Sequence, residues 1–551
     1  MPHFFVQEVR PLLYDYKSEN ATPTGNRAIW TRSYLYPFVS VFSPFSYSVV
    51  AEISRSAWFS YYTRLGAEIA FVPKTLVRNS DGRAYLDIKW ICEQDVAFAN
   101  LEPPLLHLNG APVSICPWEK PSLVAGFMLG RNQKKIADLL NRLPAEMPAI
   151  TARIRKWYDK VRGMRWTQAE ILQIMEEIEN FGTESLMAYF AARHNLERVH
   201  NSLLALIPGP DNAHRLHLIN NSLSDLDGLT ELTLTGQILA LAGMAAKDSK
   251  VMGWLEQTHA ANWAESVPPG PFAHALARLF AEFGHWATGV GEMAHPCWSE
   301  DPELVLSAIL ACAKSQTTEP KRVPSTVARQ QLLEAVDAKS RKQAEQLRES
   351  MGRLTILQSQ ALHAFAYLLA GARIWALAAG KEAAADGRLL DPQDVFLFEL
   401  EEIKQMMTGE WNITSTDGIR QRAEERRSNY AQWQNRRSPA AFFGDAPAWM
   451  ERLGLPSVGG QITGPLRRQK HLRPVLCQDA VIGARRVDSS WTPTLPVAGA
   501  FVAAAGSPLD PIVAAARAWH VPAVVGLGAE YDHLLDGAQT VVDGAAGVVK
   551  Q

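Results

Sequence analysis

The stretch Gly506-Ser-Pro-Leu-Asp-Pro-Ile-Val-Ala-Ala-Ala-Arg517 decides the fold of the C-terminal part of the chain. One glycine and two prolines indicate a turn, and the small apolar residues that follow are typical of a helix over residues 511–519. Short apolar and β-branched runs lie around this helix, at residues 499–503, 523–525 and 540–543. Strands that alternate with a helix predict a compact α/β domain over residues 455–551.

Upstream of this domain, residues 116–440 have a different composition, dominated by Ala, Leu, Glu, Gln, Lys and Arg. Apolar residues recur there with helical spacing in windows such as 171–190, 233–244, 272–283 and 304–314. Residues 325–379 predict either one very long helix or a broken pair. The prolines and glycines at 208–210 and 268–271 separate neighbouring helices. The pattern predicts a mainly α-helical central domain, without the internal period of about 30–45 residues that a helical solenoid would show.

Residues 1–115 are richer in aromatic and β-branched residues and predict a small β-containing region. The segment Arg83-Ala-Tyr-Leu-Asp-Ile-Lys-Trp90 alternates and predicts a strand, and Asp81-Gly82 before it predicts a hairpin turn. The Pro- and Asn-containing stretch 102–117 predicts a linker. The predicted fold class is therefore multidomain α+β, with divisions at residues 1–115, 116–440 and 455–551.

The composition of the 551 residues excludes several classes of protein. With 55 Lys and Arg against 57 Asp and Glu, the net charge is −2, which argues against a nucleic-acid-binding protein. Five cysteines without a CxxC pair, and no HExxH, predict neither a disulfide framework, nor a metal site, nor a cofactor. No export signal and no membrane-length apolar run is recognised, so we expect a cytoplasmic protein without a membrane partner.

Ordered motifs in the C-terminal region carry a family resemblance. They are Asp488-Ser-Ser-Trp-Thr-Pro-Thr-Leu-Pro496, the stretch 506–517, Val521-Pro-Ala-Val-Val-Gly526 and Val542-Asp-Gly-Ala-Ala-Gly547. Together they resemble the swivelling phosphohistidine domain of phosphoenolpyruvate-utilising enzymes. In the helical region, Gly284-His285, Pro296-Cys-Trp298 and Glu300-Asp-Pro302 resemble the rifampin phosphotransferase branch, as does the segment 387–396. The resemblance implies a helical substrate-binding-like domain followed by a swivelling-type α/β domain.

The family's chemistry depends on a histidine at a helix start, where free N–H groups stabilise the transferred phosphate. Alignment from Pro522-Ala-Val524 backwards places Pro511 at this histidine, and proline has no nucleophile. No ATP-grasp region is recognised either. The resemblance therefore predicts a degenerate phosphohistidine domain and an ATP-independent chain.

The motif in the helical region has also lost charged residues of the family pattern. Trp286 stands in place of an arginine, Val290 in place of an acid and Cys297 in place of a second arginine. Arginine clamps phosphate or carboxylate with a bidentate fork, so its loss indicates a loss of anion handling. Of the family's polar set, His285 and Glu292 remain.

His285 and Glu292 are candidates for an acid–base pair. They are seven residues apart, about two turns of a continuous helix, and would then share a face. The alternative is a buried core histidine and a glutamate in a salt bridge. Trp286, Trp298 and Trp491 are candidates for an aromatic substrate pocket, and their alternative role is core packing.

Asp510 lies where the family's active helix begins, and we include it as a third acid–base candidate. An aspartate at a helix start is more commonly a cap. The paired acids Glu300 and Asp301 are interpreted as part of a helix start, since adjacent residues do not face one another on a helix.

Two hypotheses of function follow. The first is an ATP-independent enzyme of secondary metabolism that binds an apolar or aromatic organic substrate. It would catalyse condensation, cyclisation or elimination with His285, Glu292 and Asp510. The alternative is a non-catalytic subunit that binds a ligand or accompanies a separate ATP-grasp partner protein.

Overall fold

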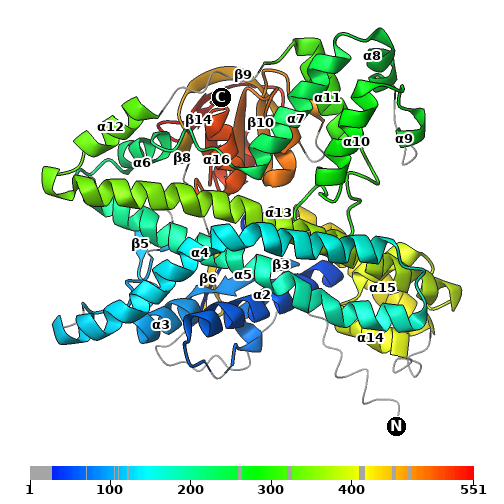
Figure 1. The fold of residues 1–551 in the computed structure, drawn as a ribbon, viewed down its shortest axis with the longest axis horizontal. Helices are drawn as coiled ribbons and strands as arrows, with labels where there is room; N and C mark the ends of the chain where they lie inside the picture. The colour runs from blue at the N-terminus through cyan, green and yellow to red at the C-terminus, as the bar shows by residue number, and fades with distance from the viewer. Residues whose placement is uncertain are drawn as a thin grey trace.

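Three long helices run side by side across the middle of the molecule (Figure 1): α4 (Leu123–Arg162), α5 (Gln168–Leu206) and α13 (Arg341–Ala385). The computed structural model describes residues 28–69, 71–104, 106–108, 111–120, 123–257, 263–318, 325–408, 416–449, 454–469 and 473–551. Helix α5 begins with a capping box, because Thr167 Oγ1 accepts from the Glu170 N–H while Glu170 Oε2 accepts from the Thr167 N–H. The multidomain α+β class predicted from the sequence is confirmed.

On one side of these helices, an antiparallel sheet joins both ends of the helical region. β1 (Ile29–Thr31), β2 (Val77–Ser80) and β3 (Arg83–Asp87) combine with β6 (Ala441–Phe443) and β7 (Ala446–Ala448) in the order β2-β3-β1-β6-β7. The predicted hairpin turn is confirmed, with Asp81 and Gly82 at positive φ between β2 and β3. The strands at residues 28–87 are therefore completed by a segment that follows the helices.

The predicted strand 83–90 is correct only as far as Asp87. The Asp87 side chain accepts hydrogen bonds from the backbone N–H groups of Lys89 (3.1 Å) and Trp90 (3.2 Å). This is an N-cap, and it starts α3 (Ile88–Ala99) within the segment whose alternation predicted a strand. A single capping side chain therefore overrides the strand pattern of the last residues.

The other helices are α2 (Pro44–Leu65), α6 (Asn212–Asn221), α7 (Thr230–Ala245), α8 (Ser249–Leu255), α9 (Trp263–Ser266), α10 (Pro271–Phe283), α11 (Glu303–Ser315), α12 (Thr326–Glu334), α14 (Leu400–Thr408) and α15 (Thr416–Asn435). The four predicted windows are helical, in α5, α7, α10 and α11, whereas the long helix α2 lies in the N-terminal region, where the sequence predicted strands and no helix. Short 3-10 helices lie at Ser33–Leu35, Lys74–Leu76, Ala338–Ser340, Pro392–Leu397, Pro474–Leu476 and Ser489–Thr494, and a two-stranded sheet is formed by β4 (Leu106–Leu108) and β5 (Ala111–Val113). For residues 325–379, the broken pair is the alternative that the structure adopts, as α12 followed by α13.

The C-terminal α/β domain has the predicted pattern. Its sheet has the order β14-β13-β9-β10-β11-β12-β8, and the neighbouring strands β9, β10, β11 and β12 are parallel. The strands are β8 (Leu455–Val458), β9 (Gln461–Arg468), β10 (Val481–Arg486), β11 (Ala500–Ala505), β12 (Ala523–Val525), β13 (Gln539–Asp543) and β14 (Val548–Lys550), and the helices are α16 (Pro511–Ala518) and α17 (Glu530–His533). Helix α16 follows β11, so its N-terminus lies at the carboxyl edge of the parallel strands.

Buried apolar residues form two large cores. The first joins the N-terminal region to α4, α5 and α13. The second joins α7, α10 and α11 to the C-terminal sheet and α16, and Figure 1 shows these elements on the far side of α13 from α2. The helices at residues 229–313 thus share their core with the C-terminal domain. The divisions at residues 115 and 440 stay predictions.

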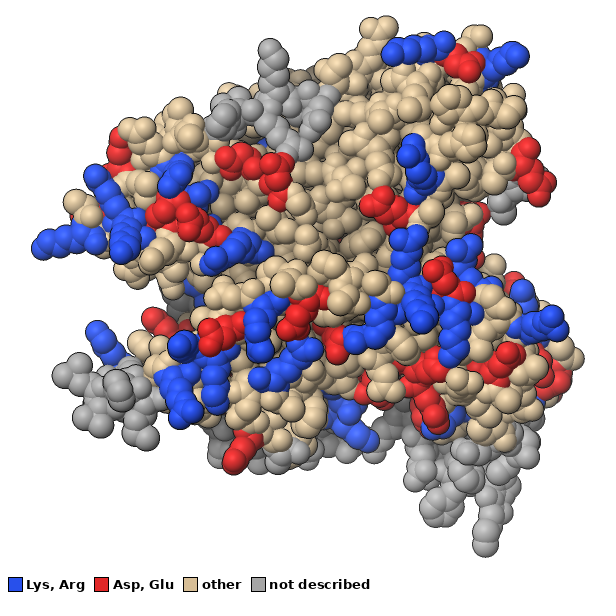
Figure 2. Space-filling view, viewed as in Figure 1, with Lys and Arg blue, Asp and Glu red and all other residues tan. Residues whose placement is uncertain are grey.

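One helix among the described residues, Ala338–Ala385, is long and apolar enough to cross a membrane, but 83% of its most apolar window is buried inside the protein. A core helix of a soluble protein has the same properties. Figure 2 shows positive and negative side chains intermingled over the layer of α4 and α5 on the face in view.

Candidate functional site

The predicted pair His285 and Glu292 lies in a loop, not on a helix. Helix α10 ends at Phe283 and α11 begins at Glu303. Gly289 and Gly291 between them have φ of 83° and 95°, a conformation that interrupts a helix and that glycine adopts at little cost. The expectation of a shared helix face was therefore wrong.

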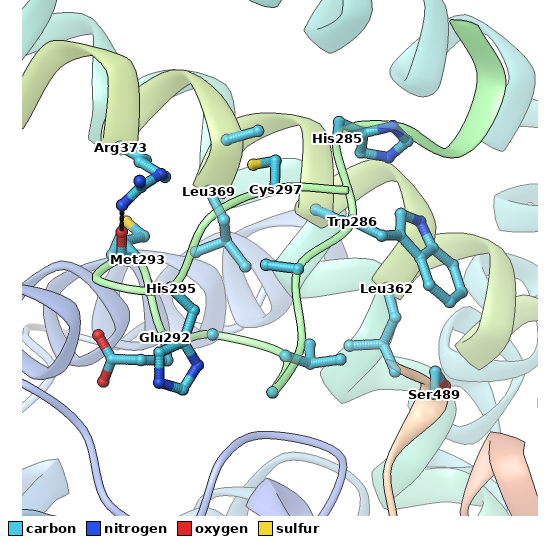
Figure 3. A pocket seen from close by; sticks show the side chains of 16 residues that line it. His285, Trp286, Glu292, Met293, His295, Cys297, Leu362, Leu369, Arg373 and Ser489 are labelled. Carbon is cyan, nitrogen blue, oxygen red and sulfur yellow. Dashed lines mark hydrogen bonds between the residues drawn. The ribbon is translucent and has the colours of Figure 1, made fainter. Parts of the chain in front are cut away.

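This loop and α13 enclose a small cavity of about 40 Å³, which we call the loop cavity. His285, Trp286, Glu292 and Arg373 are among its lining residues. In Figure 3, His285 and Glu292 lie on opposite sides of the cavity, with their polar groups turned away from each other. A cavity of this volume holds one or a few waters and excludes an aromatic substrate.

The Glu292 carboxylate is fully engaged in hydrogen bonds. It accepts from Ser43 N (2.6 Å), Ser43 Oγ (2.7 Å), Ser46 Oγ (2.8 Å) and Ala294 N (2.8 Å). Ser43 is the N-cap of α2, so the carboxylate also lies at the positive end of that helix. Glu292 therefore joins the loop to α2, and its oxygens have little capacity left to take a proton from a substrate.

His285 is buried and stacked on Tyr367, with ring centroids 3.4 Å apart and planes 11° from parallel. Burial, together with His363, lowers the pKa of His285 well below its ordinary value. Burial also lowers the pKa of His363 to about 4. Trp286 Nε1 donates to His363 Nδ1 at 3.0 Å, so the side chains form a packed cluster of neutral rings at pH 7.

The three candidate tryptophans are buried in the second core. Trp286 and Trp298 contact each other at a centroid distance of 5.5 Å, and Trp286 also lines the loop cavity. Trp491 is 7% exposed, in the 3-10 helix Ser489–Thr494 of the C-terminal domain. These positions match the packing alternative, and a role in substrate binding stays a prediction.

Asp510 lies elsewhere, at the N-terminus of α16, with Pro511 as the first helical residue. Its side chain does not cap the helix. Instead, one oxygen accepts from Arg193 Nη1 at 3.0 Å and the other from the Ser507 N–H at 2.8 Å. Burial raises the pKa of Asp510, although Arg193 and the Ser507 N–H act in the opposite direction.

Arg193 comes from α5 and is completely buried. Its second amino group, Nη2, donates to Glu197 at 2.9 Å. Burial acts to lower the pKa of Arg193, but the carboxylates of Glu197 and Asp510 raise it overall. The guanidinium is thus a charged bridge between the long helix and the C-terminal domain.

This bridge borders a second cavity, of about 380 Å³, which we call the interface cavity. One wall is α5, with Arg193, Glu197 and His200, and the opposite wall is the turn before α16, from Gly506 to Leu509. Tyr36, Leu216 and Leu455 are among its other lining residues. Gly506 has φ of 147°, and an added Cβ would lie 3.3 Å from Val525, so this turn requires glycine. No lining residue is common to the two cavities within the described part of the chain.

The α5 residues at this cavity were missed from the sequence, although a signal was present. Arg193, Glu197 and His200 are spaced i, i+4 and i+7, which puts three polar side chains on one face of α5. The neighbouring His194, Asn195 and Arg198 are polar as well, so this signal does not stand out from its surroundings. Asp510, the ion-pair partner of Arg193, is 317 residues further along the chain.

Comparison with protein-family models gives two matches. Residues 183–373 match the model described as rifampicin phosphotransferase fourth domain, and residues 476–547 match the model described as PEP-utilising enzyme, mobile domain. These matches support a PEP-utiliser/rifampin phosphotransferase-like family. The α5 wall lies in the first match and the turn before α16 in the second, so the interface cavity forms where a fourth-domain-like segment meets a mobile-domain-like segment.

A search of curated proteins found no match for the chain. Among the described residues, no group of three or more His, Cys, Asp and Glu side chains is placed to hold a metal ion.

Proposed function

We propose that this chain is an ATP-independent enzyme of small-molecule, secondary metabolism, and that its substrate binds in the interface cavity. The observation that carries the proposal is the cavity itself, whose volume is within the range of about 300–1,000 Å³ found for small-molecule sites. Its lining combines apolar residues such as Leu204, Leu216 and Leu509 with polar residues from α5. A largely apolar organic molecule with one or two polar groups fits this lining.

In this proposal, Glu197 and His200 take the acid–base role first assigned to His285 and Glu292. Both line the cavity, and carboxylates and imidazoles are the side chains that most often transfer protons in enzymes. Arg193 holds Glu197 from one side and Asp510 from the other, which fixes the geometry of this wall. Condensation, cyclisation and elimination all require such proton transfers.

The chemistry does not pass through a phosphohistidine at the start of α16. The first helical residue there is Pro511, and the residue before it is committed to the ion pair with Arg193. A proline side chain cannot accept a phosphoryl group.

One observation favours a second candidate, a non-catalytic ligand-binding protein or a subunit for a separate ATP-grasp partner. Glu292 and Asp510, two of the three predicted acid–base residues, are engaged in structural bonds. In this alternative the cavity binds its ligand without changing it.

The test uses purified protein exposed to a metabolite extract, followed by native mass spectrometry. We expect a small-molecule adduct on the wild type and none on Ala213→Trp, which places an indole at the lining of the interface cavity. Met244→Trp is the matched control, because Met244 is 39% exposed on α7 and away from the cavity. Recovery of a changed molecule from the wild type, but not from His200→Ala, supports the enzyme, and an unchanged molecule supports the binding protein. Equal adducts on Ala213→Trp and wild type would exclude the cavity as the site.

A further inference from the structure

A cluster of buried arginines lies beside the sheet that contains β1 and β3. Arg32, Arg83 and Arg486 have relative exposures of 4%, 2% and 7%. None of the three forms a salt bridge with a described carboxylate. Arg32 donates to Val39 O, Ser40 O and Ser40 Oγ, Arg83 to three backbone carbonyls, and Arg486 to the carbonyl of Leu35.

Burying three charged guanidinium groups close together costs folding free energy unless a negative charge lies beside them. A buried charge is stabilised by a counter-ion far better than by carbonyl dipoles, and like charges in a medium of low dielectric repel. Burial and the nearby Arg32 lower the pKa of Arg83 to about 10, and the same two causes lower that of Arg486 to about 10. The arrangement has an excess of positive charge that the described carboxylates do not neutralise.

A cavity of about 80 Å³ opens onto this cluster, and we call it the arginine pocket. Arg32, Arg83, Arg436, Arg437 and Arg485 line it, together with Asp532. Asp532 is the one acid among these lining residues, and it lies 2.9 Å from Arg485 and 3.9 Å from Arg437. Asp81, outside the lining, lies 3.2 Å from Arg436. No described carboxylate is paired with Arg32 or Arg83, the two buried arginines of the lining. Tyr36, Ser40 and Ser438 add hydroxyl groups to the lining.

The position of the pocket in the fold points to a ligand as well. Arg485 is near the end of β10, Ala504 and Ala505 end β11, and Gly528 follows β12. These neighbouring strands are parallel, and the crevice outside the carboxyl ends of parallel strands is the usual place for ligands in such sheets.

We infer that the arginine pocket binds a phosphate group. A tetrahedral oxyanion offers several acceptor oxygens at once to guanidinium groups that converge from different elements, and guanidinium forks pair with phosphate bidentately. The volume accepts one such group and little more. The inference rests on the five arginines, none of which lines the interface cavity, and it does not depend on the proposed function.

The phosphate has two possible sources. It is either a free anion or one end of a larger molecule, because the arginine pocket and the interface cavity share Tyr36 and Ala440 in their linings. Inorganic phosphate and phenyl phosphate are the two probes that separate these sources.

The experiment measures binding of each probe by calorimetry, at constant ionic strength with chloride as the balancing anion. We expect binding to the wild type, weakened about tenfold or more in the double variant Arg437→Gln, Arg485→Gln. Both side chains are about half exposed, so this variant is expected to fold. Arg467→Gln, an exposed arginine of β9 outside the pocket, is the matched control and should bind like the wild type.

Tighter binding of phenyl phosphate identifies a phosphate ester as the ligand class, and equal affinities identify the free anion. The inference is overturned if neither probe binds the wild type, or if the double variant binds both as the wild type does. Arg83→Gln supplies a second measurement: phosphate should raise the melting temperature of the wild type and leave that of this variant nearly unchanged. An equal rise in both would also overturn the inference.

Discussion

The loop cavity and the interface cavity differ in what their polar side chains are bonded to. Around the loop cavity, Glu292 has five hydrogen-bond donors and His285 is stacked in a cluster of neutral rings. At the interface cavity, Arg193, Glu197 and His200 line a volume of about 380 Å³, roughly tenfold larger. His285 and Glu292, which keep the family's identity, thus hold the scaffold together. The space for a ligand lies between the turn 506–509, which belongs to a family motif, and residues of α5 that no motif singled out.

The largest expected effect concerns the ion pair between Arg193 and Asp510. Arg193→Met should lower the free energy of unfolding by about 3–5 kcal/mol, because Asp510 is left as a buried charge without its partner. Urea unfolding monitored by tryptophan fluorescence measures the change.

The matched control is Lys314→Gln, which removes an ion pair of 2.7 Å whose two side chains are about half exposed. Its expected cost is below about 1 kcal/mol. Equal losses in the two variants would show that the interface pair is solvated and does not join the domains.

The next largest effect tests whether Glu292, at the loop cavity, stabilises the fold or takes part in catalysis. Glu292→Gln should cost about 2–3 kcal/mol, because an amide NH₂ replaces an oxygen that serine hydroxyls and backbone N–H groups donate to. The exposed Glu349→Gln on α13 is the control for the same chemical change. If Glu292→Gln instead abolished turnover at unchanged stability, the loop cavity would be the active site.

The buried His285 should make the free energy of unfolding depend on pH. Its folded-state pKa lies below its unfolded value, so the neutral ring contributes stability that is fully present above about pH 6.5 and is lost as the pH falls. Between pH 7 and pH 5 the loss should be about 1–2 kcal/mol for this histidine. His285→Phe keeps the stacking on Tyr367 and should reduce the loss of stability by this amount, leaving the share that comes from His363, measured by urea unfolding at both pH values. An unchanged slope would show that His285 is already solvated in the folded state.

The smallest expected change in stability is at the interface cavity. His200 is partly buried, so His200→Ala should alter the free energy of unfolding by only about 1 kcal/mol. The same substitution should abolish the conversion of the bound molecule. Mass spectrometry of the recovered small molecule, together with urea unfolding of the same sample, checks both parts. A large loss of stability with normal conversion would reverse the contrast between the cavities.

Phosphoryl transfer is expected to give no signal. Incubation with ATP or phosphoenolpyruvate labelled on the phosphate should leave the protein unlabelled, because Pro511 offers no nucleophile. Acid-labile label on any histidine would contradict the proposed function directly.

The local parts of the fold could be predicted from the sequence, and the long-range parts could not. Asp81-Gly82 specified its hairpin, and the prolines at 208–210 and 268–271 separated helices as expected, since these signals act within a few residues. The pairing of β1 with β6 has no local signal, because the partner strand follows the whole helical region.

The candidate site shows the same limit. Separation by seven residues predicted a shared helix face for His285 and Glu292, but the positive φ of Gly289 and Gly291 turned this segment into a loop. Asp510 was recognised as a helix start, whereas its ion pair with Arg193 depends on how two distant regions pack. The spacing of Arg193, Glu197 and His200 places them on one face of α5, but polar neighbours surround them in the sequence, and only the structure showed a cavity in front of this face.

The sheet that combines β1 and β3 with β6 has a consequence for synthesis on the ribosome. Arg83 binds the carbonyls of Trp433 and Arg436, some 350 residues later in the chain. At about 5–20 residues per second, tens of seconds separate the appearance of these partners. During that interval the strands at residues 29–87 have an open edge that a nascent chain nearby can pair with. Slower translation should therefore lower the soluble yield of this protein. A higher level of a chaperone that binds nascent chains at the exit tunnel should restore the yield.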